Sequence, residues 1–76
     1  MAKLPIENRI RELRYRHGEM TQQDLADRIG VTRQTVLAIE NGKYSPTLEL
    51  AFQIAAVFGL ELGEVFVYVP GRRGRS

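Results

Sequence analysis

The stretch from Thr21 to Gly42 constrains the fold more than any other part of the sequence, because its caps and apolar residues delimit short helices. Thr21 is a favourable N-cap for a helix from Gln22 to Ile29. Apolar residues four positions apart share one face of this helix: Leu25 and Ile29. Gly30 ends it, since glycine adopts the left-handed conformation of a helix end at no steric cost.

A second helix is predicted from Arg33 to about Glu40, with Thr32 as its N-cap and Asn41-Gly42 as its end. Its inward face carries Val36 and Ile39. Two helices joined by a turn of about three to four residues that contains a glycine form a helix-turn-helix. The sequence therefore predicts this motif over residues 21–42.

Three further helices and one extended segment complete the prediction. A first helix runs from about Ile6 to His17, with Pro5 near its first turn. Thr47 caps a helix that begins near Glu49 or Leu50, and a short fifth helix runs from Leu62 to about Phe66. The expected fold class is all-α, with five helices followed by a short extended segment.

Five motif residues, at intervals of four, four, six and three, resemble those of the phage-repressor and Cro-type regulators, often called the Xre family: Gln22, Ala26, Gly30, Val36 and Ile39. The resemblance continues through RIRELRYRHG at 9–18 and SPTLELAFQIAAVFGLELGEVF at 45–66. It implies a five-helix, lambda-repressor-like DNA-binding domain over residues 1–66. Residues 67–76 are expected to form a strand-like segment and a basic tail. The implied function is sequence-specific binding of double-stranded DNA by a transcriptional regulator, a dimeric repressor that reads an inverted repeat.

The outward face of the second motif helix carries the candidate base-reading residues. Because Val36 and Ile39 face the core, the start of the helix and its opposite face point outward. The first residues of a recognition helix contact base edges in the major groove, where Arg pairs with guanine and Gln with adenine. The candidate base contacts are Arg33, Gln34, Thr35 and Ala38.

A second set of residues is predicted to bind phosphates or outer bases: Thr21, Gln22, Thr32, Asn41, Lys43 and Tyr44. Gln22 resembles the family glutamine with this role, and the N-terminus of its helix favours an anion. Lys43 and its neighbours lie in the loop after the recognition helix and can reach the DNA backbone on its other side. By resemblance, Arg14 and Glu40 form a partly buried ion pair with an architectural role.

Composition argues against several other classes of protein. The 76 residues include no cysteine and one histidine, His17, so we expect neither a disulfide nor a metal site. No catalytic set or glycine-rich phosphate loop is recognisable, and we therefore expect no cofactor and no enzymatic activity. Pro5 and nearby charges interrupt the N-terminal segment, so we expect no signal peptide, no membrane partner and a cytoplasmic location.

The net charge of +2 is distributed unevenly. Residues 1–46 contain eight Lys or Arg against six Asp or Glu, residues 47–70 contain none against three, and the final GRRGRS adds three arginines. This distribution fits a protein with one DNA-facing side. Alternatively, the arginines of the first helix interleave with Glu7 and Glu12 as a solvated, salt-bridged face: Arg9, Arg11, Arg14 and Arg16.

The segment VFVYV has the alternation of a β-strand: Val65, Phe66, Val67, Tyr68 and Val69. No other strand is predicted in the chain, so we expect antiparallel pairing with the same segment of a second copy. Such a homodimer would place two recognition helices about 34 Å apart. In the alternative, Phe66 caps the core, Tyr68 lies on the surface, and dimerisation uses the fifth helix or occurs only on DNA.

The sequence is also compatible with a second class of function, different from that of a DNA-binding regulator. The same scaffold can serve as a protein-interaction module, such as an antitoxin bound to a toxin or other protein partner, with DNA binding secondary or absent. The outward Arg33 and Gln34 favour the DNA-binding class.

Overall fold

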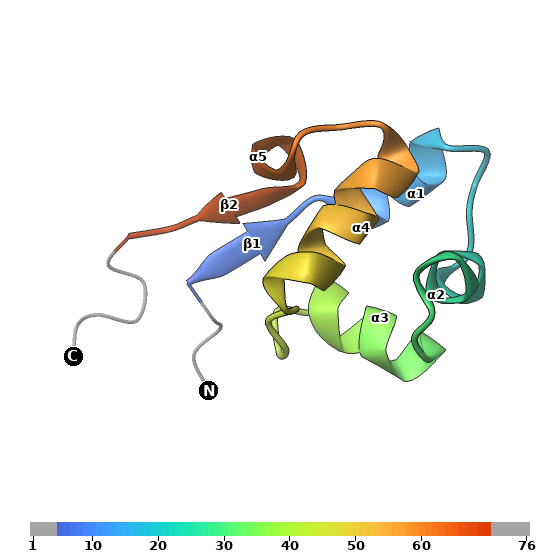
Figure 1. Cartoon of the computed structure of the whole chain (residues 1–76), viewed down its shortest axis with the longest axis horizontal. Coiled ribbons are helices and arrows are strands. Elements are labelled where there is room, and N and C mark those ends of the chain that lie inside the picture. Colours follow the sequence, from blue (N-terminus) through green and yellow to red (C-terminus); the bar gives the residue numbers. More distant parts are fainter. Residues whose placement is uncertain (1–4, 71–76) are drawn as a thin grey trace.

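Five helices and a two-stranded sheet make up the part of the chain that this computed structural model describes, residues 5–70 (Figure 1). The elements follow in the order β1 (Ile6–Asn8), α1 (Ile10–Arg16), α2 (Gln22–Ile29), α3 (Arg33–Glu40), α4 (Leu48–Phe58), α5 (Leu62–Val65) and β2 (Phe66–Tyr68). The predicted five-helix fold is confirmed. The basic tail with Arg72, Arg73 and Arg75 lies outside the described residues.

One apolar core joins all five helices. Its largest fully buried side chains come from each of them: Ile10, Leu25, Val36, Ile39, Ile54 and Val65. Burying an aliphatic side chain of this size contributes about 1.5–3 kcal/mol to folding. Because two of these side chains belong to α3, the core fixes the rotation of α3 about its own axis.

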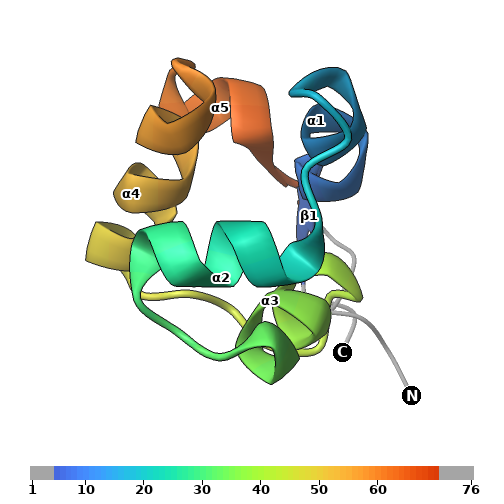
Figure 2. The same cartoon turned by 90° about the vertical axis from the view of Figure 1, so that its right-hand side faces the viewer.

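The predicted helix-turn-helix is present, and both of its helices have the predicted bounds. The Thr21 hydroxyl accepts a hydrogen bond from the Asp24 N–H at 2.9 Å, and the Asp24 carboxylate accepts one from the Thr21 N–H at 3.1 Å. This capping box starts α2, and Gly30 ends it with a φ of 75°. Thr32 caps α3, and the fully buried Ala26 lets the two helices lie side by side (Figure 2).

The N-terminal helix begins later than predicted. Residues Ile6 to Asn8 form β1, which pairs antiparallel with β2 so that Ile6 lies opposite Tyr68 and Asn8 opposite Phe66. Pro5 precedes this strand, and its carbonyl accepts the Val69 N–H at 2.7 Å. The prediction of a helix from Ile6 was wrong, because this backbone binds a segment about 60 residues away, which helical periodicity cannot reveal.

The segment VFVYV is divided between two elements. Val65 ends α5 with a fully buried side chain, so its predicted place in a dimer interface is wrong. Phe66 to Tyr68 form β2, which crosses the domain boundary predicted after Phe66. The expectation that the segment has no strand partner in its own chain is also wrong, since β1 supplies that partner.

The remaining helices follow the sequence closely. Thr47 caps α4 through a hydrogen bond of 3.2 Å from the Leu50 N–H, and the helix starts at Leu48, one residue before the prediction. Gly59 ends α4 in the left-handed conformation. Within residues 5–70, none of the helices has the length and apolar character needed to cross a membrane.

Candidate nucleic-acid interface

The start of α3 presents polar side chains to solvent. Arg33 and Gln34 are exposed, and Gln34 has no side-chain hydrogen bond among the described residues. Thr35 and Ala38 are half-buried. The Thr35 N–H donates to the Thr32 hydroxyl at 3.2 Å, and the two hydroxyls lie 3.0 Å apart, so the cap holds the first turn of α3 in place.

Gln22, in the first turn of α2, lies beside this exposed turn. Its side-chain oxygen accepts a hydrogen bond from Nη1 of Arg33 at 3.4 Å, and its amide nitrogen donates to Oε1 of Glu40 at 3.2 Å. The structure thus brings a predicted base-reading residue and a predicted phosphate-binding residue into direct contact. Thr21, the residue before Gln22, is exposed and acts as the N-cap of α2.

The other candidate phosphate contacts follow α3. Asn41, Lys43 and Tyr44 are exposed in the loop between α3 and α4. Gly42 adopts a φ of 73° there, and the Lys43 N–H donates to the carbonyl of Ala38 at 2.9 Å. The turn is therefore held by the backbone, and the side chains of Lys43 and Tyr44 are free to face a ligand. Candidate phosphate contacts thus lie at both ends of the motif.

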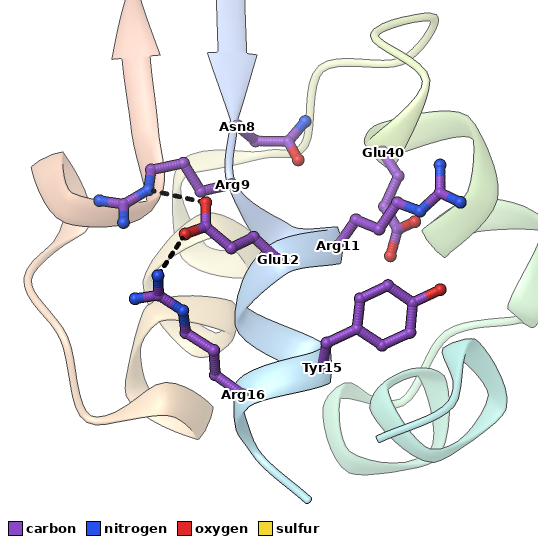
Figure 3. A pocket seen from close by; sticks show the side chains of 7 residues that line it. All are labelled: Asn8, Arg9, Arg11, Glu12, Tyr15, Arg16 and Glu40. Atoms are coloured by element: carbon purple, nitrogen blue, oxygen red, sulfur yellow. Dashed lines mark ion pairs between the residues drawn. The ribbon is translucent and has the colours of Figure 1, made fainter. Parts of the chain in front are cut away.

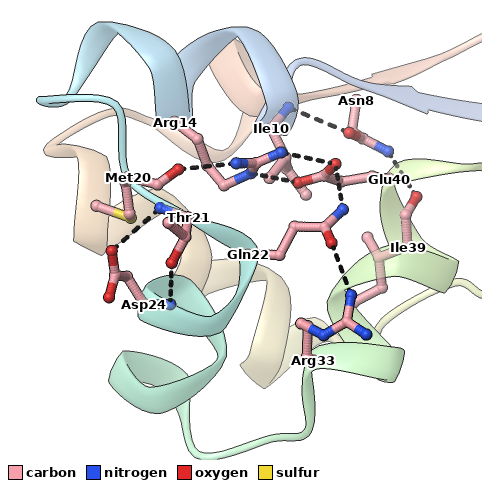
Figure 4. A network of polar contacts seen from close by, with 10 residues as sticks. All are labelled: Asn8, Ile10, Arg14, Met20, Thr21, Gln22, Asp24, Arg33, Ile39 and Glu40. Atoms are coloured by element: carbon pink, nitrogen blue, oxygen red, sulfur yellow. Dashed lines mark hydrogen bonds and ion pairs between the residues drawn. The ribbon is translucent and has the colours of Figure 1, made fainter.

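A buried ion pair connects α1 with the end of α3 (Figure 4). Nε of Arg14 lies 2.6 Å from Oε2 of Glu40, and Nη2 lies 3.2 Å from Oε1. The two side chains are 7% and 5% exposed. Nη1 of Arg14 donates to the carbonyl of Met20 at 2.7 Å, so the guanidinium has partners on both sides. The predicted ion pair between these residues is present.

An open groove runs beside α1, and Figure 3 shows its lining residues: Asn8, Arg9, Arg11, Glu12, Tyr15, Arg16 and Glu40. Glu12 forms ion pairs with Arg9 at 3.6 Å and with Arg16 at 2.9 Å. The alternative of a salt-bridged helix face is therefore present for Arg9 and Arg16. Arg11 is exposed and has no hydrogen bond or ion pair within the described residues, so its charge stays available to an anion.

Two residues with clear structural roles were not singled out from the sequence. The Asn8 side chain forms hydrogen bonds with both α1 and α3. Local sequence patterns do not predict its contact with Ile39, which lies 31 positions away. Asp24 completes the capping box of α2. The sequence does contain the signal for this role, because an acidic residue three positions after a threonine cap is typical of a helix start.

Side chains that could bind a metal ion do not gather into a site in the described part of the chain. No group of three or more His, Asp or Glu side chains gathers in a way that could hold one within residues 5–70. The ring of His17 instead packs edge-on against Phe58, with ring centres 5.1 Å apart. His17 thus covers the end of the core beside α4.

Comparison with known proteins places the chain in a family. The family described as helix-turn-helix matches residues 10–65. An HTH-type transcriptional regulator of Methanocaldococcus jannaschii is 48% identical over 63 residues, which make up 83% of this chain and 94% of the regulator. The phage CTXphi transcriptional repressor RstR of Vibrio cholerae is 36% identical over 58 residues, or 76% of this chain and 51% of the repressor.

Solved structures give the same result. The restriction-modification controller protein C.AhdI of Aeromonas hydrophila superposes with a TM-score of 0.66 at 32% identity, over 74% of this chain and 80% of C.AhdI. A protein from Bacteroides fragilis shares the fold with a TM-score of 0.69 at 20% identity, over 80% of this chain and 97% of that one. The chain therefore belongs to the helix-turn-helix family of Xre-type, DNA-binding transcriptional regulators.

Proposed function

We propose that the protein is a dimeric repressor that inserts α3 into the major groove of an inverted repeat. One observation carries this proposal. Arg33 and Gln34 are exposed at the start of α3, whereas Val36 and Ile39 on its inner face are 1% and 2% exposed. The core therefore determines which side chains face outward, and the candidate base-reading groups stand on a rigid element.

The exposed groups have the chemistry that base recognition needs. The Arg33 guanidinium can donate two hydrogen bonds to O6 and N7 of a guanine, and the Gln34 amide can pair with N6 and N7 of an adenine. The methyl groups of Thr35 and Ala38 are only half-buried and can contact the methyl group of a thymine. Together these residues provide contacts to several neighbouring base pairs.

Phosphate contacts would fix the orientation of α3 in the groove. Gln22 lies at the N-terminus of α2, where backbone N–H groups and the helix dipole favour a phosphate. Thr21 and Thr32 lie at the two helix starts, while Asn41, Lys43 and Tyr44 are exposed beyond the end of α3. In this arrangement the two DNA strands that border the major groove are each bound from one end of the motif.

We place the dimer interface at the free edge of β2. The Val69 N–H and the Val65 carbonyl bind Pro5 and Arg9, the residues on either side of β1. Because backbone groups alternate in direction along a strand, the N–H and carbonyl of Tyr68 point to the opposite edge. Val67 and Tyr68 are 44% and 65% exposed. Pairing of two β2 strands about a two-fold axis would satisfy the edge groups and cover these side chains.

The substitution Tyr68→Pro tests this interface, because it removes the outward N–H and leaves the groups that bind β1 in place. We expect sedimentation to show a dimer for the unmodified chain and a monomer for the variant at the same concentration. Phe52→Ser is the matched control, since Phe52 is an exposed aromatic residue on α4, outside the sheet. A Tyr68→Pro variant as dimeric as the unmodified chain would overturn the interface.

Selection of bound sequences from random DNA tests the function itself. We expect enrichment of inverted repeats whose half-sites are about one helical turn, or 10–10.5 base pairs, apart. Transcription in vitro from a promoter that overlaps the selected site should then decrease when the protein is added. Failure to enrich any sequence would contradict the proposal, and an increase in transcription would exclude repression.

Two exposed apolar side chains favour a second candidate function, a protein-interaction module. Leu48 and Phe52 on α4 are 67% and 54% exposed. Apolar side chains grouped on a surface are typical of protein contacts, and a toxin is one such partner. If this is the main function, substitution of both by Ser should abolish partner binding, and no DNA sequence should be selected.

A further inference from the structure

The buried ion pair and the candidate base-reading arginine belong to one continuous chain of hydrogen bonds. Glu40 accepts from Arg14 and, through Oε1, from the Gln22 amide nitrogen at 3.2 Å. The Gln22 oxygen in turn accepts from Arg33 at 3.4 Å. Figure 4 shows these side chains one after another in space, from the interior near Met20 to the exposed start of α3.

Helix geometry explains how a residue at the end of α3 can affect one at its start. Glu40 and Arg33 are seven positions apart, so they lie on the same side of α3, separated by about 10 Å along its axis. Gln22 spans this gap from the neighbouring α2. The three side chains therefore form a bridge along one side of α3, from the buried Glu40 to the exposed Arg33.

The charges at the two ends of the bridge determine the orientation of the Gln22 amide. A carboxylate can only accept hydrogen bonds, and a guanidinium can only donate them. The amide nitrogen of Gln22 must therefore face Glu40, and its oxygen must face Arg33. The flipped amide would place oxygen against oxygen at one end and N–H against N–H at the other.

We propose that Glu40 is a positioning residue for DNA recognition, which orients the Arg33 guanidinium through the Gln22 amide. One donor of Arg33 is held by Gln22, which leaves the others for a guanine. A side chain held before binding loses less conformational freedom on binding, so it discriminates between bases more strongly. This role rests on the proposed function, in which Arg33 reads a base. It also assigns Gln22 a positioning role in addition to its predicted phosphate contact.

The test measures a discrimination ratio between two DNA sites. The ratio is the Kd for a site in which the base pair contacted by Arg33 has been changed, divided by the Kd for the selected site. That base pair is the one whose discrimination is lost in Arg33→Ala. We expect Glu40→Gln to lower the ratio by about tenfold, equal to the loss of one bidentate contact. The control is Arg14→Lys, which weakens the same ion pair but leaves the Glu40 carboxylate to hold Gln22, so the ratio should stay within about twofold.

A second variant keeps the test decisive if Glu40→Gln does not fold. Gln22→Met breaks the bridge without touching the ion pair and should lower the ratio as Glu40→Gln does. The double substitution Glu40→Gln with Gln22→Glu restores a donor facing an acceptor at each step of the bridge and should recover the ratio.

The outcomes separate this inference from the proposed function. An unchanged ratio in Gln22→Met, or an equal loss in Arg14→Lys and Glu40→Gln, would overturn the role of Glu40. If Arg33→Ala loses discrimination at no base pair, the result would instead overturn the proposal that Arg33 reads a base.

Discussion

The side-chain amide nitrogen of Asn8 donates a hydrogen bond to the backbone carbonyl of Ile39 across 2.8 Å, although 31 positions separate the two residues. The oxygen of the same amide accepts from the Ile10 N–H at 3.1 Å, at the start of α1. One side chain therefore joins β1, α1 and the last turn of α3. It supports the C-terminal end of α3, whereas the candidate base-reading residues lie at its N-terminal end.

Substitution of Asn8 should destabilise the fold. In Asn8→Ala, the Ile10 N–H loses its hydrogen-bond partner, at a cost of about 1–3 kcal/mol, while the Ile39 carbonyl keeps its bond from the Gly42 N–H. Urea unfolding followed by circular dichroism measures the free energy of unfolding. Arg11→Ala is the control, since Arg11 is exposed and has no partner within the described residues. Equal stability of the two variants would contradict the role of Asn8.

Acid should weaken the start of α2. Hydrogen bonds from the backbone N–H and then the hydroxyl of Thr21 lower the pKa of Asp24 from its usual 3.8. A carboxyl group with a lowered pKa in the folded state stabilises the fold above its unfolded pKa, and this stability is lost as the pH falls through the lowered value. The Tm of Asp24→Asn should therefore decrease less than that of the unmodified chain below about pH 4. Parallel decreases in Tm would contradict this contribution.

The Arg14–Glu40 ion pair should show strong coupling. Each single substitution to Met leaves one buried charge without its partner, which costs about 3–5 kcal/mol. Replacing both with Met removes both charges, so the double variant should lose less stability than the two single variants together. Thermal unfolding of all four chains provides this comparison. Additive losses would show that the two side chains act independently.

Local signals explain why the helix-turn-helix could be predicted and the sheet could not. Thr21, Gly30 and Thr32 specify helix ends through hydrogen bonds and backbone angles within four residues, so their effect is visible in the sequence. β1 has only three residues, and its partner strand lies about 60 positions away. The predicted ion pair depended on family resemblance, and the bridge through Gln22 became visible only when α2 and α3 were placed together.

Lys43 should contribute to DNA affinity without selecting a sequence. It is exposed in the loop after α3 and is assigned to a phosphate. Lys43→Ala should weaken binding to the selected site and to unrelated DNA alike, and should reduce the slope of log K against log salt by about one unit. Fluorescence anisotropy over a range of salt concentrations gives this slope. Weakening confined to the selected site would instead mean that Lys43 reads a base.

The central claim is that the exposed start of α3 reads DNA sequence, and the double substitution Arg33→Ala with Gln34→Ala tests it most directly. Each bidentate base contact supplies about 1–3 kcal/mol of discrimination. The ratio of Kd values for unrelated and selected DNA should therefore fall to near one, while the helical circular dichroism and the Tm change little, because both side chains are exposed. An unchanged preference for the selected site in this folded variant would contradict the assignment.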